Sequence, residues 1–198
     1  MDPKAGDNFQ SQKALDAIKQ GGLTGQGMGA GIFNAKNKKK VAVINLMGNI
    51  FMKKCEDVFE STKKFIQTVK LKRDADFIIV DLHGEITSEK MAMGYFFDGK
   101  ATLVVGTHTH IPTSDHRILE KGTAYQTDIG MCGDYNSVIG MNRDNSLKKF
   151  FKDPSAKKHY PAVGEATISG LMVQADDETG LAKKIEPIIV GGVLENRI

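Results

Sequence analysis

Three short apolar runs, rich in β-branched residues, constrain the fold of this 198-residue chain more than any other feature. The runs are Val41 to Leu46 (VAVINL), Phe77 to Leu82 (FIIVDL) and Thr102 to Val105 (TLVV). Short apolar runs without polar alternation are typical of strands that are buried on both faces, as in parallel sheets. Segments with helical spacing lie between them, so the pattern predicts an α/β fold with a mixed sheet.

Two helices are expected between these strands. Apolar residues recur at helical spacing from Cys55 to Lys70. A second helix is predicted from Thr87, acting as N-cap, to about Phe97, with Glu89 in its first turn. The remaining predicted elements are a strand at Thr123–Thr127, a helix at Asn145–Phe151, and an antiparallel pair at Glu165–Ala175 and Leu181–Val190.

The first thirty residues differ in composition from the rest of the chain. Six glycines fall between Gly21 and Gly31, and no strand leads into them, so they form no dinucleotide-binding fingerprint. We expect residues 1–30 to be an irregular or flexible segment that contains a short helix at Gln10–Lys19. Residues 31–198 are expected to form one domain.

Composition excludes several classes of protein. The net charge of +3 is small, so nucleic acid is not the expected partner, and the basic run Lys36–Lys40 is interpreted as a solvated turn or, alternatively, a phosphate contact. Cys55 and Cys132 are far apart, which argues against a disulfide framework and excludes a cysteine-based zinc site. No apolar run reaches the about 18 residues of a membrane span, and the first residues do not resemble a signal peptide. We therefore expect a cytoplasmic protein without a membrane partner.

Three of the five histidines directly follow predicted strands. His83 comes after FIIVDL, and His108 and His110 belong to VVGTHTH, after the next strand. In open α/β sheets ligands bind beyond the carboxyl ends of the strands. Neutral imidazole is a good ligand for zinc, iron or manganese, so the spacing predicts a metal site made by these three side chains. The alternative, hydrogen-bonded loop histidines, is the interpretation kept for His116 and His159.

Neighbouring oxygen atoms could fix the tautomers of the three rings. The candidates for this outer role are Glu85, Thr107 and Asp128. Asp81 is either another such partner or a buried polar residue of its strand.

Longer stretches carry a family resemblance. "VVGTHTHIPTSD", "DLHGEITSEKMAMGYFFDGKA" and "GTAYQTDIGMCGDYNSVIGM" resemble the bacterial YmdB-like metallophosphoesterases, calcineurin-like phosphodiesterases associated with 2′,3′-cyclic nucleotides. The resemblance extends from about Gly29 to Gly192. It implies a metallophosphoesterase-type α/β/β/α sandwich with mixed sheets and two metal ions, described as iron, manganese or zinc. It also implies that His83, His108 and His110 are metal ligands.

The chain departs from the family pattern near its start. The family's Gly-Asp, Gly-Glu-Asn and Gly-Asn-His motifs, which supply further ligands and the acid histidine, have no counterpart here. "AGDN" at 5–8 follows no strand, "MGNI" at 47–50 ends in Ile50, and "LENR" lies at the wrong place. The chain therefore resembles the C-terminal two-thirds of the family, with its N-terminal part incomplete. One metal ion or none is expected, and no catalytic residue is assigned.

The sequence supports one functional interpretation and one alternative. The first is metal-dependent hydrolysis of phosphodiesters or phosphomonoesters, with 2′,3′-cyclic nucleotides as substrates and a metal-activated hydroxide as nucleophile. The alternative is a catalytically inactive metal-binding fragment or regulatory remnant. Absence of the family's first strands would expose a sheet edge, so a homo-oligomer is also expected.

Overall fold

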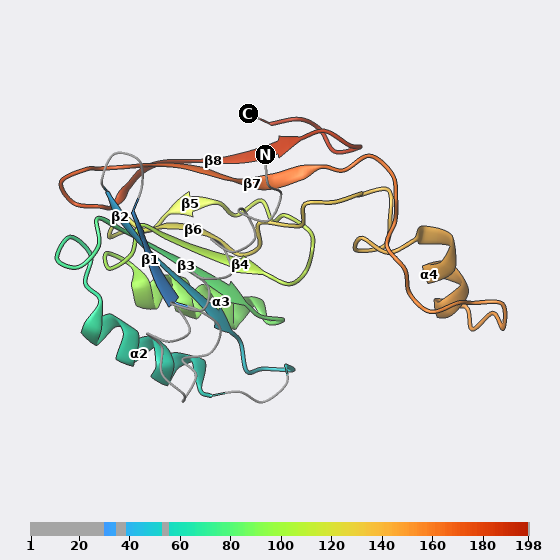
Figure 1. Cartoon of the computed structure of the whole chain (residues 1–198), viewed down its shortest axis with the longest axis horizontal. Coiled ribbons are helices and arrows are strands. Elements are labelled where there is room, and N and C mark those ends of the chain that lie inside the picture. The colour runs from blue at the N-terminus through green and yellow to red at the C-terminus, as the bar shows by residue number, and fades with distance from the viewer. Residues whose placement is uncertain (1–29, 35–38, 53–55, 198) are drawn as a thin grey trace, which may run out of the picture.

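The computed structural model describes residues 30–34, 39–52 and 56–197, and its strands form two sheets (Figure 1). The larger sheet has six strands in the order β1-β2-β3-β4-β6-β5, and the smaller pairs β7 with β8. The strands are β1 Ala30–Asn34, β2 Lys40–Met47, β3 Phe77–His83, β4 Leu103–Thr107, β5 Arg117–Ile118, β6 Ala124–Gln126, β7 Ile168–Ala175 and β8 Ala182–Val190.

Strands β2, β3, β4 and β6 are parallel, and antiparallel β1 and β5 pair at the two ends of the sheet. The predicted α/β fold with mixed sheets is therefore confirmed. Because the four central strands run the same way, their carboxyl ends share one edge of the sheet. At this edge His83 ends β3, and His108 and His110 follow β4.

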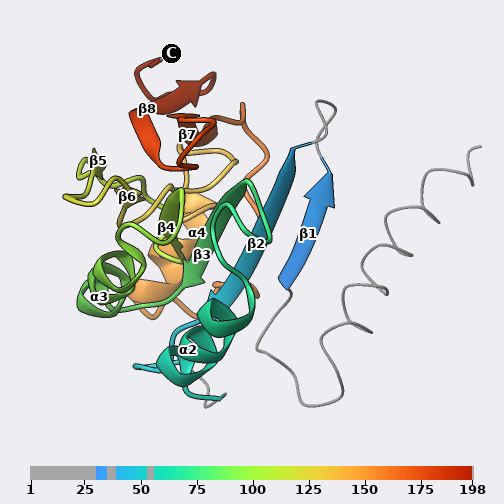
Figure 2. The same ribbon diagram turned by 90° about the vertical axis from the view of Figure 1, so that its left-hand side faces the viewer.

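Helices α2 (Val58–Thr68) and α3 (Thr87–Phe97) cover one face of the large sheet (Figures 1 and 2). Their apolar side chains join those of the strands in a single core. Phe65, Met93 and Phe97 pack there on Ile78 and Val80, and all five are at least 97% buried. Burying a side chain of this size contributes about 1.5–3 kcal/mol, so this face anchors the sheet.

The opposite face of the large sheet is apolar at the amino ends of its strands and polar at their carboxyl ends. Near the amino ends of β2, β3 and β4 it presents Val41, Phe77 and Leu103, which are half-buried and line a cavity with residues of β7. Successive side chains of a strand alternate between faces, so the same rows continue to Asn45, Asp81, His83 and Thr107 at the carboxyl ends. The polar end of this face is where a site can form.

Several element boundaries differ from the predicted ones. Helix α2 begins at Val58, because Asp57 caps it by accepting from the N–H groups of Phe59 and Glu60. Helix α3 begins at Thr87 and has Ile86 as its N-cap, with no side-chain cap bond, so the prediction that Thr87 is the cap is wrong.

Helix α4 (Arg143–Phe150) starts two residues before the predicted helix, because the side chain of Asn142 accepts from the N–H group of Asn145. It lies apart from both sheets (Figure 1). Strands β1 and β5 were not predicted. The predicted helix Gln10–Lys19, the glycine-rich segment up to residue 29 and Cys55 lie outside the described residues. None of the helices in the described ranges is both long and apolar enough to cross a bilayer.

Candidate functional site

A row of hydrogen bonds crosses the carboxyl ends of β2, β3 and β4. Asn45 Nδ2 donates to Asp81 Oδ2 at 2.6 Å, and the hydroxyl of Thr107 donates to Asp81 Oδ1 at 3.0 Å. Thr107 Oγ1 also lies 3.1 Å from Nδ1 of His83. The parallel register explains the row, since Asn45 pairs with Asp81 and His83 pairs with Thr107 on adjacent strands.

This row determines the tautomer of His83. The Thr107 hydroxyl gives its one proton to Asp81, so it must accept from His83, which therefore carries its proton on Nδ1. Burial, followed by repulsion from His108, lowers the pKa of His83 below its ordinary value. The ring is thus neutral near pH 7 and has a free lone pair on Nε2.

His108 is held from both sides. Its Nδ1 lies 3.0 Å from Nε2 of His83, and its Nε2 lies 2.8 Å from Oε2 of Glu85. The two imidazole rings are perpendicular, with centroids 4.8 Å apart. The carboxylate of Glu85 can only accept from Nε2–H of His108. The atoms His83 Nε2 and His108 Nδ1 therefore face one another.

His110 is turned toward a different partner. Its Nδ1 lies 2.7 Å from the carbonyl oxygen of Ile139, in the loop before α4. A carbonyl can only accept, so His110 carries its proton on Nδ1 and leaves the lone pair on Nε2.

The backbone between these histidines has an unusual conformation. His108 and His110 have φ values of 114° and 68°, in a region that non-glycine residues rarely adopt and that costs of order 1–3 kcal/mol each. Asp128 stabilises the segment, since its Oδ2 accepts from the N–H of Thr109 and from Nζ of Lys90, both at 2.9 Å. The side chains of Lys90 and Asp128 are fully buried. A buried ion pair thus fixes residues 108–110, the histidine loop, which carries the rings of His108 and His110.

These nitrogens have the arrangement that metal-binding histidines need. A ligating histidine usually donates its other N–H to a carboxylate, a hydroxyl or a backbone carbonyl, as His83, His108 and His110 do here. Two nitrogens bound to one tetrahedral zinc at 2.0–2.1 Å lie roughly 3.3 Å apart. The observed 3.0 Å between His83 and His108 is close to that separation. The pair His83–His108 therefore has a separation and a donor type that suit a transition-metal ion.

The fit is partial in one respect. Within the described residues, no three histidine, cysteine, aspartate or glutamate side chains surround a common point. His83, His108 and Glu85 are linked in a row, and His110 faces the carbonyl of Ile139.

Comparison with known proteins identifies the family. The model of the YmdB-like protein family matches residues 20–188, most of the chain. This chain belongs to the YmdB-like family.

Relatives and solved structures agree with this assignment. A Bacillus subtilis protein named 2′,3′-cyclic-nucleotide 2′-phosphodiesterase is 44% identical over 163 residues, which are 82% of this chain and 61% of that protein. The crystal structure of a phosphatase from Mycoplasma pneumoniae superposes with a TM-score of 0.72 at 39% identity, over 83% of this chain and 58% of that one. A hypothetical protein from Thermus thermophilus gives a TM-score of 0.74 at 34% identity, over 84% and 63%. The YmdB-like chain thus spans about three-fifths of the length of its relatives.

In this YmdB-like chain, the residues predicted to fix the imidazole tautomers have different partners. Thr107 contacts the ring of His83, and Glu85 contacts the ring of His108. Asp128 hydrogen bonds to the backbone of the histidine loop and to Lys90, rather than to an imidazole. Asp81 is the acceptor of the Thr107 hydroxyl.

Three further residues support the site and were not predicted to do so. Asn45 was detectable as a polar residue inside an apolar strand. Lys90 lies three residues before Met93, so helical spacing places it on the buried face of α3. Its partner Asp128 could not be predicted from that spacing. Ile139 contributes only a carbonyl oxygen, which no side-chain pattern reveals.

Proposed function

We propose that this chain takes part in metal-dependent hydrolysis of phosphodiesters or phosphomonoesters, with 2′,3′-cyclic nucleotides as substrates. One observation carries the proposal: His83 Nε2 and His108 Nδ1 face one another at 3.0 Å while the far nitrogen of each ring is held by an oxygen. The name of the B. subtilis relative supplies the substrate class.

The residues that would hold the metal are His83, His108 and His110, and the ions that suit imidazole here are iron, manganese or zinc. When bound, such an ion polarises a phosphoryl oxygen and lowers the pKa of a water molecule. Thr107 and Asp81 would orient His83, and Glu85 would hold the proton on Nε2 of His108. Asp128 would hold the histidine loop in place, because it accepts hydrogen bonds from the N–H of Thr109 and from Lys90.

The second candidate is a metal-binding chain that performs no chemistry. The linear arrangement of His83, His108 and Glu85 favours it, because the described residues do not by themselves surround an ion. Three neutral ligands without bridging carboxylates would also hold two dications poorly.

Turnover separates the two candidates. The purified chain would be incubated with 2′,3′-cyclic AMP and Mn²⁺, with EDTA and His108→Ala as negative controls. His159→Ala is the matched control, since His159 is exposed and lies outside the site. Turnover that is lost with EDTA and in His108→Ala but kept in His159→Ala supports the enzyme. No turnover by a folded sample supports the metal-binding chain.

We also propose a setting for the chain. Residues 31–198 would act as one domain in the cytoplasm, where exposed Cys132 would stay reduced. The half-buried apolar face around Ile79 would be covered by a second copy, giving a homo-oligomer.

A further inference from the structure

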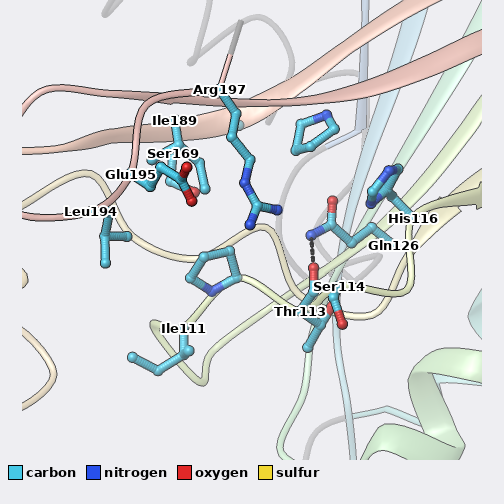
Figure 3. A pocket seen from close by; sticks show the side chains of 13 residues that line it. Ile111, Thr113, Ser114, His116, Gln126, Ser169, Ile189, Leu194, Glu195 and Arg197 are labelled. Atoms are coloured by element: carbon cyan, nitrogen blue, oxygen red, sulfur yellow. Dashed lines mark hydrogen bonds between the residues drawn. The ribbon is translucent and has the colours of Figure 1, made fainter.

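A cavity of about 280 Å³ lies between the two sheets (Figure 3). It is lined by the segment that follows His110, by β6, by β7 and β8, and by the C-terminal segment. Its volume is close to the about 300 Å³ at which ligand pockets begin. The residues that surround it contribute to no step proposed above.

The wall of the cavity contains a buried acceptor without a partner. Gln126 is 2% exposed, and its Oε1 receives no hydrogen bond from any residue that the structure describes. Its Nε2 donates to the carbonyl oxygens of Thr113 and Asp128 at 2.6 and 3.0 Å. Because both partners are carbonyls that can only accept, the amide cannot be flipped. An unsatisfied buried acceptor is costly, so this wall calls for an N–H or O–H donor.

The rim of the cavity contains a cation. Arg197 belongs to none of the ion pairs formed among the described residues, and its guanidinium points toward the same space as the Gln126 amide (Figure 3). Its backbone is fixed, because its N–H and carbonyl both hydrogen bond to Ile189 at 2.8 Å. Guanidinium groups bind phosphate through paired N–H donors. Glu195 lies on the same rim and can accept from a sugar hydroxyl.

Apolar side chains complete the walls. Ile111, Pro187 and Leu194 also line the cavity. A ligand that satisfies these groups has an apolar body, an N–H or O–H donor and an anionic group.

We propose that this cavity binds a nucleoside monophosphate whose base carries an exocyclic amino group, with the amino group on Gln126 and the phosphate on Arg197. The inference rests on the proposed function, because hydrolysis of the 2′ ester of a 2′,3′-cyclic phosphate adds water and leaves a nucleoside 3′-monophosphate. Asp128 connects the two sites, since its carbonyl binds the Gln126 amide and its carboxylate binds the histidine loop.

The test is direct binding without turnover. Isothermal titration calorimetry in EDTA would compare adenosine 3′-monophosphate with inosine 3′-monophosphate, which has a carbonyl in place of the amino group. We expect the adenine nucleotide to bind about ten-fold more tightly, or more, since the inosine carbonyl cannot donate to Oε1. Arg197→Gln should weaken adenine nucleotide binding by a similar factor. Arg143→Gln, the same change in α4 away from the cavity, should leave binding unchanged.

Equal affinity for the two nucleotides overturns the inference, as does undetectable binding or wild-type affinity in Arg197→Gln. The nucleotide comparison uses the unmodified chain, so it stands even if Arg197→Gln fails to fold. Selective binding without any turnover would contradict only the proposed function. Turnover by the wild type together with equal affinity for the two nucleotides would contradict only the inference.

Discussion

Gly106, in β4 just before the histidine loop, has no space for a side chain. A Cβ atom at this position would lie 1.8 Å from the carbonyl oxygen of Thr127 and 2.6 Å from Cδ of Lys90. The nearest atom belongs to backbone, so the strands would have to separate. We expect Gly106→Ala to lower the free energy of unfolding by about 3 kcal/mol or more, measured by urea denaturation.

Gly170 provides the matched control for that substitution. It lies in β7, and a Cβ atom there would meet nothing within 4 Å. Gly170→Ala should stay within about 0.5–1 kcal/mol of the wild type. Equal losses of unfolding free energy in the two variants would contradict the view that the backbone contact at Gly106 excludes a side chain.

Asp115 makes part of the stability depend on pH. Burial would raise the pKa of its carboxyl, but hydrogen bonds donated by Thr113, Thr127 and Arg117 outweigh burial and hold the pKa below its ordinary value. A depressed folded-state pKa stabilises the fold above the unfolded pKa of about 3.9, and this contribution is lost as the pH falls through the folded value.

Asp115→Asn should therefore lower the free energy of unfolding by about 1–3 kcal/mol at pH 7. The difference should shrink as the pH falls below the unfolded pKa, and it should vanish only below the lower pKa of the folded carboxyl, where the wild type is protonated too. Urea denaturation at pH 7 and pH 3 measures both values. A difference between the two proteins that does not change with pH would contradict this role of the carboxylate.

At the scale of elements, the pair Lys90–Asp128 fastens helix α3 to the segment after β6. Lys90→Met would leave the buried Asp128 carboxylate with backbone donors alone, at a cost of about 3–5 kcal/mol. The matched control is Lys184→Met, which removes a surface pair with Glu186 that is worth at most about 1 kcal/mol. Similar losses of unfolding free energy in the two variants would contradict a special role for the buried pair.

Strands were easier to predict than their boundaries and partners. The runs that became β2, β3 and β4 are continuous and apolar, which indicates a strand even though one of their faces is only half-buried. Strand β5 has two residues and exists only because it pairs with β6, so no local pattern could indicate it. The start of α3 has no side-chain cap hydrogen bond, so it depends on the path of the chain after β3 and not on a local sequence signal.

The same division holds for the candidate site. Proximity of His83 and His108 follows from parallel strands that end at one edge, and it was predictable from spacing. The orientation of His110 was not, because it depends on a carbonyl 29 residues away in the sequence. The buried partner of Asp128 likewise comes from a different element, helix α3.

At the scale of the whole molecule, the half-buried apolar face around Ile79 predicts association. Val41, Ile79 and Leu103 line a cavity of about 240 Å³ with residues of β7, opposite the face that the helices cover. We propose that the accessible part of this apolar surface is an interaction surface, as larger apolar patches commonly are. Sedimentation velocity over a range of concentrations should therefore show species larger than the monomer. A single monomeric species with a cooperative thermal melt would contradict the proposed oligomer.

We propose that the histidines at the carboxyl edge of the sheet act as one metal centre. Equilibrium dialysis against Mn²⁺ tests it without requiring turnover. We predict that His83→Ala, His108→Ala and His110→Ala each weaken Mn²⁺ binding at least about ten-fold, while His159→Ala binds as the wild type does. Unchanged Mn²⁺ affinity in the three folded variants, or no binding by the wild type, would contradict the claim.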